Sequence, residues 1–200
     1  MPEPIMGLCT LVLAAGQGSR YRELVDQDKL LAPSRDTPAA PGVLASTLES
    51  LAGITERLVV VTREDNLALR AWLDQRAGSF GAEVFTVRSN GLGHSLARAV
   101  AQYPAEQGWL VALGDMPYIR RETIRGIAAE IRQERLVVPR HVGQLGHPRG
   151  IGSCYRSQVM ALDGDRGAQA LFASGPVTEV EVDDVGVLQD IDRPEDRRDA

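Results

Sequence analysis

Short runs of consecutive apolar residues recur along the chain, separated by longer and more polar stretches. These runs do not alternate strictly between apolar and polar positions. A short, continuous apolar run is typical of a strand that is buried on both faces of a sheet. We therefore predict strands at residues 8–13, 58–62, 84–87, 109–113 and 136–138.

Helical patterns lie between these runs. Ile124, Ile127, Ala128 and Ile131 have the i, i+3, i+4, i+7 spacing of one helical face, and residues 67–73 form a second, mostly apolar stretch. Strands that alternate with helices imply a mainly parallel sheet with both faces covered. The pattern predicts a three-layer α/β/α fold. No repeat or linker divides the chain, so we treat residues 1–200 as a single domain.

The first apolar run leads directly into a turn that contains glycine and is followed by two cations. Gly16 and Gly18 come shortly after Leu13, and Arg20 and Lys29 follow them. Glycine allows backbone N–H groups to approach a phosphate that a Cβ would hold off. This arrangement predicts a site for a nucleoside triphosphate, although a Gly-x-Gly after a strand equally fits a tight turn.

Two other glycine motifs do not fit this turn. The Walker pattern ends in Gly-Lys-Ser/Thr, whereas Gly18 is followed by Ser19 and Arg20. The dinucleotide fingerprint needs a third glycine where Tyr21 stands. Neither a P-loop nor a dinucleotide site is predicted.

A carboxylate follows the fourth apolar run. Asp115 comes directly after residues 109–113, in a turn with Pro117. In open parallel sheets ligands lie beyond the carboxyl ends of the strands, so we expect Asp115 and the glycine turn at one edge. A triphosphate site needs a divalent cation, and Asp115 is the first candidate ligand for Mg²⁺. A turn or helix-cap role is the alternative.

A second acidic group lies near the end of the chain. Asp190 is a candidate for a second Mg²⁺ ligand, with a strand-end role as the alternative. Asp192 and Pro194 fit the cap and the first turn of a terminal helix.

The composition limits the possible partners and location. A formal net charge of −5 argues against the basic surface that binds duplex nucleic acid. An aromatic content of 4% leaves few side chains on which the bases of a single strand could stack. We expect no nucleic-acid partner. No window approaches the roughly 18 apolar residues of a membrane span, and we expect a cytoplasmic protein without membrane contact. Cys9 and Cys154 lie in apolar segments and are expected to be buried and reduced.

Taken in order, the motifs resemble those of the molybdenum cofactor nucleotidyltransferases, particularly the cytidylyltransferase branch. The resemblance runs from residue 13 to residue 196 and is more specific than any single motif. Its motifs are Leu13-Ala14-Ala15-Gly16-x-Gly18-x-Arg20 with Lys29, Asn90-Gly91-x-Gly93-x-Ser95, Leu113-Gly114-Asp115-Met116-Pro117, Gly146-His147-Pro148, Gly164-Asp165-x-Gly167-Ala168 and Asp190-Ile191-Asp192-x-Pro194-Glu195-Asp196.

The resemblance implies a Rossmann-like nucleotidyltransferase fold with a mainly parallel mixed sheet. The implied reaction is Mg²⁺-dependent transfer of a nucleoside monophosphate from an NTP to the phosphate of molybdopterin, with release of pyrophosphate. A molybdoenzyme is a possible partner. Two alternatives stay open: another phosphorylated acceptor, such as a sugar or isoprenoid-precursor phosphate, and a non-catalytic chaperone that binds nucleotide or cofactor.

The resemblance also implies roles for individual residues. The triphosphate is held by Gly16, Gly18, Arg20 and Lys29, and Mg²⁺ is bound by Asp115. Asp190, Asp192 and His147 are expected near the metal and the pterin side of the cleft. Leu13, Ala14 and Ala15 belong to the nucleotide site, and the paired alanines favour CTP over GTP, because guanosine-using relatives have Ala-Gly there.

Two further positions are candidates for the base or the ribose. These are Asn90 and Ser95, although Ser95 equally fits the cap of the helix that carries Leu96.

Four arginines are candidates for a basic rim toward an anionic pterin: Arg140, Arg149, Arg156 and Arg166. On a surface rich in arginine we favour solvated side chains for them. His94 and Arg149 depart from the usual cytidylyltransferase pattern, since a small residue is common at the first position and an apolar pair usually follows the His-Pro step.

Overall fold

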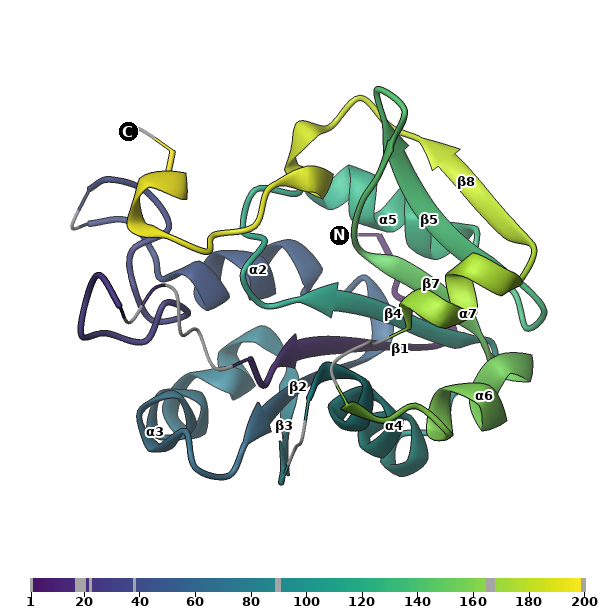
Figure 1. Cartoon of the computed structure of the whole chain (residues 1–200), viewed down its shortest axis with the longest axis horizontal. Helices are drawn as coiled ribbons and strands as arrows, with labels where there is room; N and C mark the ends of the chain where they lie inside the picture. Colours follow the sequence, from purple (N-terminus) through teal and green to yellow (C-terminus); the bar gives the residue numbers. More distant parts are fainter. Residues whose placement is uncertain are drawn as a thin grey trace.

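An eight-stranded sheet forms the centre of the computed structural model, which describes residues 2–16, 21, 23–37, 39–88, 91–164 and 168–198. The strands are β1 (Ile5–Ala14), β2 (Thr55–Arg63), β3 (Ala82–Val87), β4 (Gly108–Leu113), β5 (Leu136–His141), β6 (Gln144–Leu145), β7 (Arg149–Gly152) and β8 (Val177–Glu181). Their order is β3-β2-β1-β4-β7-β5-β6, and β8 pairs with β5 (Figure 1).

The sheet is mixed but mainly parallel. β1 is parallel to β2 and β4, β2 is parallel to β3, and β5 is parallel to β8. β7 lies antiparallel between β4 and β5, so those two strands share a direction, and β6 is antiparallel to β5. The predicted fold class is confirmed.

Each of the five predicted strands lies within one of β1 to β5. The other three strands lack a continuous apolar run. β7 has the sequence Arg-Gly-Ile-Gly, β8 has the sequence Val-Thr-Glu-Val-Glu, and β6 has two residues.

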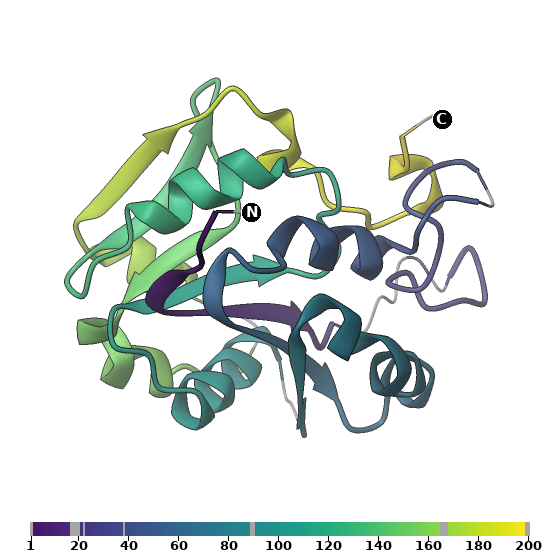
Figure 2. The ribbon, with the colours of Figure 1, turned by 180° about the vertical axis from the view of Figure 1, so that it is seen from behind.

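Helices cover both faces of the sheet. They are α2 (Val43–Leu51), α3 (Leu67–Arg76), α4 (Leu92–Gln102), α5 (Arg121–Ala129), α6 (Arg156–Met160) and α7 (Gln169–Ser174), with 3₁₀ turns η1 (Ala77–Phe80), η2 (Ser153–Tyr155), η4 (Val185–Leu188) and η5 (Pro194–Asp196). Buried residues of α2, α3 and α5 pack on one face, and those of α4, α6 and α7 on the other (Figures 1 and 2). The helices predicted at 67–73 and 124–131 correspond to α3 and α5. In the described ranges, the model contains no helix with the length and apolar character needed to cross a bilayer.

The two faces of β1 show why its sequence is apolar throughout. Leu8 and Val12 belong to the core under α2, α3 and α5, whereas Leu11 and Leu13 belong to the core under α4, α6 and α7. All four are buried, as expected for a central strand of a three-layer fold.

The cysteine prediction is half right. Cys9, in β1, is buried, but Cys154 is exposed, and both are free thiols. The prediction for Cys154 was wrong because the residue lies in the turn η2, just after β7, rather than inside the sheet.

Candidate active site

The carboxyl ends of β1 and β4 lie side by side and present two loops to one edge of the sheet (Figure 1). The Gly114 N–H donates to the carbonyl of Leu13 at 3.0 Å, which ties the two loops together. A Cβ on Gly114 would lie 3.3 Å from that carbonyl oxygen, so the close approach favours glycine there. At Gly16, in contrast, a Cβ would meet no atom of the described residues within 4 Å.

Lys29 reaches this edge from the loop between β1 and α2, and its two acidic partners lie far away in sequence. Its Nζ lies 2.7 Å from Oδ2 of Asp115 and 3.0 Å from Oδ1 of Asp192. The lysine side chain is only 12% exposed. Burial by itself lowers the pKa of Lys29, but the charges and hydrogen bonds of the two carboxylates outweigh it, and the net pKa is raised. Lys29 is thus a fixed cation at neutral pH.

The loop that carries Lys29 is held by hydrogen bonds to its neighbours. The Asp28 carboxylate accepts the N–H of Leu30 at 2.9 Å and the side-chain amide of Asn66 at 2.6 Å. The carbonyl of Leu30 accepts the N–H of Leu44 at the start of α2. These contacts join the loop to both α2 and α3.

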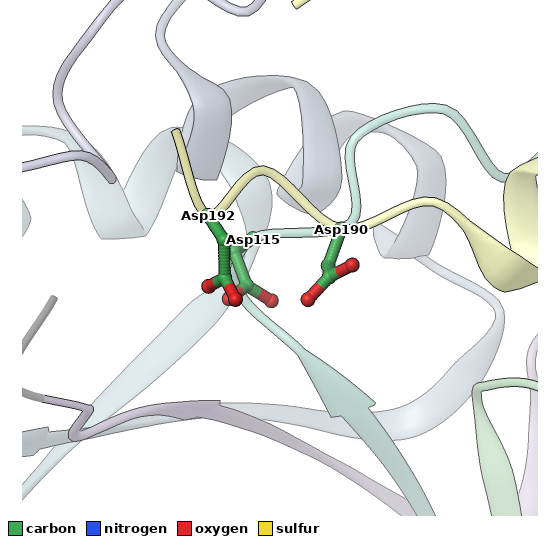
Figure 3. A group of neighbouring side chains, drawn as sticks. All are labelled: Asp115, Asp190 and Asp192. Atoms are coloured by element: carbon green, nitrogen blue, oxygen red, sulfur yellow. The ribbon is translucent and has the colours of Figure 1, made fainter. Parts of the chain in front are cut away.

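A third carboxylate completes the cluster. One oxygen each from Asp115, Asp190 and Asp192 lie within 4.8 Å of one another. Figure 3 shows these side chains projecting to the same side, Asp115 from the loop after β4 and the other two from the C-terminal segment. Burial raises the pKa of Asp190, and the negative charge of Asp115 adds to this effect. Three acids with one lysine leave a net negative site.

The carboxylate cluster fits a divalent cation. Oδ1 of Asp115 is buried and has no hydrogen-bond partner among the described residues, although a buried charged oxygen normally has one. Carboxylate oxygens are the ligands that Mg²⁺ and Mn²⁺ prefer. The unpartnered oxygen and the converging acids are the features expected where a cation binds.

The C-terminal segment is fixed to the β4 loop by backbone and side-chain bonds. The Ile191 N–H donates to the Asp115 carbonyl at 2.9 Å, so Asp190 and Asp192 flank a residue that is hydrogen-bonded directly to the loop after β4. Further back, buried Asp184 accepts the N–H groups of Arg120 and Gly186 at 2.9 and 3.0 Å. These bonds set the position of both C-terminal acids.

The cap interpretation of Asp192 is wrong. The N-cap position of η5 is held by Arg193, and the Asp196 carboxylate accepts the N–H groups of Asp192 and Arg193 at 3.0 and 2.7 Å. The Asp192 carboxylate turns instead toward Lys29. Pro194 begins η5, as predicted.

A cavity of about 130 Å³ lies next to this edge, under the ends of β1 and β4. Its walls include Leu13 and Leu113, and His147 and Arg149 reach it from the start of β7. Burial, with a smaller contribution from the charge of Arg149, lowers the pKa of His147 to about 4. His147 is therefore neutral at pH 7, and its buried Nδ1 has no partner in the described part of the chain.

The remaining predicted residues fall into two groups. Ala14 is buried at the end of β1 and Ala15 is half-buried just after it. Ser95 lies inside α4, buried, and its hydroxyl donates to the Gly91 carbonyl at 3.1 Å. It does not cap this helix, which begins at Leu92. Outside the described residues are Gly18, Arg20, Asn90 and Arg166.

The strand order of the sheet and the lysine–carboxylate cluster at its edge are those of a nucleotidyltransferase-type α/β fold. A family model described as "MobA-like NTP transferase domain" matches residues 10–181, and the chain belongs to this family.

Solved structures and curated proteins agree with this family. Rv0371c from Mycobacterium tuberculosis H37Rv superposes with a TM-score of 0.79 at 29% identity, over 98% of this chain and 96% of that chain. A structure of Rv0371c in complex with manganese gives 0.71 at 28% identity, over 89% of each chain. The bifunctional protein GlmU from Synechococcus sp. (strain CC9311) is 30% identical over 149 residues, which are 74% of this chain and 31% of GlmU. The chain thus spans about a third of the curated relatives it matches.

Proposed function

We propose that this protein is a nucleotidyltransferase that moves a nucleoside monophosphate from an NTP to a phosphorylated acceptor and releases pyrophosphate. The observation that carries the proposal is the cluster of Lys29, Asp115, Asp190 and Asp192 at the carboxyl ends of β1 and β4. We propose CTP as the preferred nucleotide, molybdopterin as the acceptor and Mg²⁺ as the cation.

The cluster supplies what such a transfer requires. Phosphoryl-group chemistry needs positioning and stabilisation of negative charge more than covalent help from side chains. A cation held by Asp115 and the C-terminal acids would neutralise charge on the phosphates. Lys29 contributes a second positive charge, and the N–H groups after β1 donate to phosphate oxygens. The acceptor phosphate is ionised at neutral pH, so no side-chain nucleophile is needed.

The choice of substrates rests on narrower grounds. The paired Ala14 and Ala15 before Gly16 favour CTP, and the Gly-His-Pro sequence at His147 supports molybdopterin. His147 and the carboxylate cluster are linked, since the His147 N–H donates to the carbonyl of Val187 at 2.9 Å, three residues before Asp190. A ligand that touches both would bridge the acceptor and nucleotide sides of one site.

The test is pyrophosphate release with Mg²⁺ and molybdopterin, with CTP, GTP and ATP compared in parallel. We expect release with CTP. Asp115→Asn should lower the rate by about 10²- to 10³-fold, as the loss of a charge-stabilising group does elsewhere. Asp74→Asn, on the exposed side of α3, is the matched control and should leave the rate unchanged.

Other outcomes of this test would favour a different acceptor or a different function. Release only with a sugar phosphate or isoprenoid-precursor phosphate would replace the acceptor and keep the reaction. Nucleotide binding without release on any acceptor would favour the non-catalytic chaperone. An Asp115→Asn variant with full turnover would remove the carboxylate cluster from the mechanism.

A further inference from the structure

The cavity beside the carboxylate cluster has a mostly apolar lining, to which His147, Arg149 and Gln169 add polar side chains. Leu92 and Leu96 of α4 close one side, and Leu13, Leu113 and Ile151 form the floor on the sheet. Arg149 brings a guanidinium group into this lining from the first position of β7. Arg149 is half-buried, and a cation partly withdrawn from solvent among leucine and isoleucine side chains normally has a counter-ion.

Arg149 has no counter-ion in the part of the chain that the structure describes. Its guanidinium carbon lies 4.9 Å from the centre of the Phe172 ring, and its Nε lies 3.4 Å from the Gly146 carbonyl. Neither contact neutralises the charge. Arg140, nine residues earlier, lies near Glu179 at 2.8 Å and Glu181 at 3.5 Å. Arg140 is therefore paired with glutamates and Arg149 is not paired with any described acid, although both are candidates for the same basic rim.

Burial already acts on this charge. It lowers the pKa of Arg149, although the group stays protonated, because arginine titrates far above neutral pH. The charge of Arg149 also contributes to keeping the neighbouring His147 neutral. An anion in the cavity would relieve the cost of desolvating Arg149, and Nδ1 of His147, which no described residue contacts through a hydrogen bond, would add one.

The cavity lies close to the carboxylate cluster along the chain. Leu113 lines it, and Asp115 is two residues further on. The cavity volume of about 130 Å³ leaves room for an oxyanion and the atoms attached to it.

We propose that Arg149 binds an anionic group of the acceptor, a carboxylate or a phosphate, and that the apolar cavity selects the part of the acceptor attached to it. This inference rests on the proposed function and names a specificity-determining residue for it. The same oxyanion chemistry is present in the phosphates of the NTP, so the experiment must separate the two sources.

The test uses inorganic phosphate as the probe and the imidazole NMR signals of His147 as the readout. The chain has three histidines, so the signals can be assigned with single His→Gln variants. The nucleotide site is first saturated with a non-hydrolysable CTP analogue and Mg²⁺. Phosphate should then shift the His147 signals in the wild type. Binding should weaken at least tenfold in Arg149→Met and less in Arg149→Lys, and Arg140→Met, the matched control, should bind as the wild type does.

Two results would overturn the proposal. One is an unchanged phosphate affinity in Arg149→Met, or no shift of the His147 signals at all. The other is a loss of CTP affinity in Arg149→Met that matches the loss of phosphate affinity, because it would assign Arg149 to the nucleotide. We expect its CTP dissociation constant to stay within twofold of the wild type. Thermal unfolding of each variant checks its fold, and Arg149→Lys keeps the test valid if Arg149→Met unfolds.

The anion readout does not depend on turnover. If no acceptor supports pyrophosphate release, the proposed function fails while the phosphate titration still reports on Arg149. Once an acceptor is found, Arg149→Met should raise its KM at least tenfold and leave kcat within about twofold, whereas a merely structural role would lower both kcat and the folded fraction.

Discussion

Replacing Lys29 with methionine removes a cation that pairs with both Asp115 and Asp192. Methionine keeps most of the length of the side chain without the charge. In the wild type a metal ion that enters the cluster meets the positive charge of the lysine ammonium and must compete with it for the same two carboxylates. We therefore expect Lys29→Met to bind Mn²⁺ more tightly than the wild type in the absence of nucleotide.

The size of this gain follows from the contacts that are lost. A hydrogen bond to a charged group contributes about 1.5–3 kcal/mol. Asp192 is 37% exposed, so solvent screens its pair, and we count only the contact to Asp115, which is 19% exposed. Removing that competition should tighten Mn²⁺ binding by about 10- to 150-fold.

The same change should weaken the metal-free fold. Three carboxylates lose the cation between them, and we expect a loss of about 2 kcal/mol in the free energy of unfolding. Mn²⁺ at a hundred times its dissociation constant should restore about 2.7 kcal/mol, because it binds only the folded cluster. Stability and metal affinity are thus two independent readouts of one substitution.

The assay is a titration of Mn²⁺ followed by the EPR signal of the free ion, together with urea unfolding with and without Mn²⁺. Asp74→Asn is the control for a general change in surface charge. The double variant Lys29→Met/Asp115→Asn should lose the gain, since a ligand is missing. Equal or weaker Mn²⁺ binding by Lys29→Met would refute the reasoning, because it would mean that the lysine does not compete with the metal.

Three further expectations concern stability. Asp184→Asn should destabilise the fold by about 2–3 kcal/mol in urea unfolding, because asparagine is uncharged and has one oxygen where the carboxylate uses two to accept the N–H groups of Arg120 and Gly186. A change under about 0.5 kcal/mol would contradict this. Val142 has a φ of +46° and is 82% exposed, so Val142→Asn should raise the thermal unfolding temperature by relieving about 1 kcal/mol of strain, and an unchanged temperature would argue against strain there. His147 has a pKa of about 4 when folded and about 6.5 when unfolded, so the unfolded state takes up the proton first and stability falls as the pH drops below 6.5. Between pH 7 and pH 5 the wild type should lose about 2 kcal/mol more than His147→Gln, and parallel pH profiles of the two would contradict the expectation.

The strands that could be predicted are those whose own residues are apolar throughout. β2 carries Val59, Val60 and Val61 in succession, and its burial on both faces can be predicted from the sequence alone. β7 cannot be found in this way, because its glycines are explained by neighbours from other segments. A Cβ on Gly150 would collide with Ile131, and one on Gly152 with the backbone at Gln133. These neighbours are known only after the chain has folded.

The residues of the candidate site also differ in whether they can be predicted from the sequence. Local patterns singled out Lys29 and Asp115, one beyond a glycine turn and the other at the end of a strand. Nothing local distinguishes Arg149 from Arg140, since both are arginines in short strands. The difference lies in the glutamates of β8, which reach one arginine and not the other. A charge balance of this kind depends on tertiary contacts.

The contacts of Lys29 also bear on when activity can appear during synthesis. They span 86 and 163 residues, and the second joins the loop after β1 to the last part of the chain. Contacts of such separation form late, because a long loop must close first. A nascent chain that ends before Asp190 has the glycine turn and the lysine but only one of the three carboxylates. Catalytic competence should therefore arise only after the C-terminal segment has docked, and incomplete chains would not consume nucleotide.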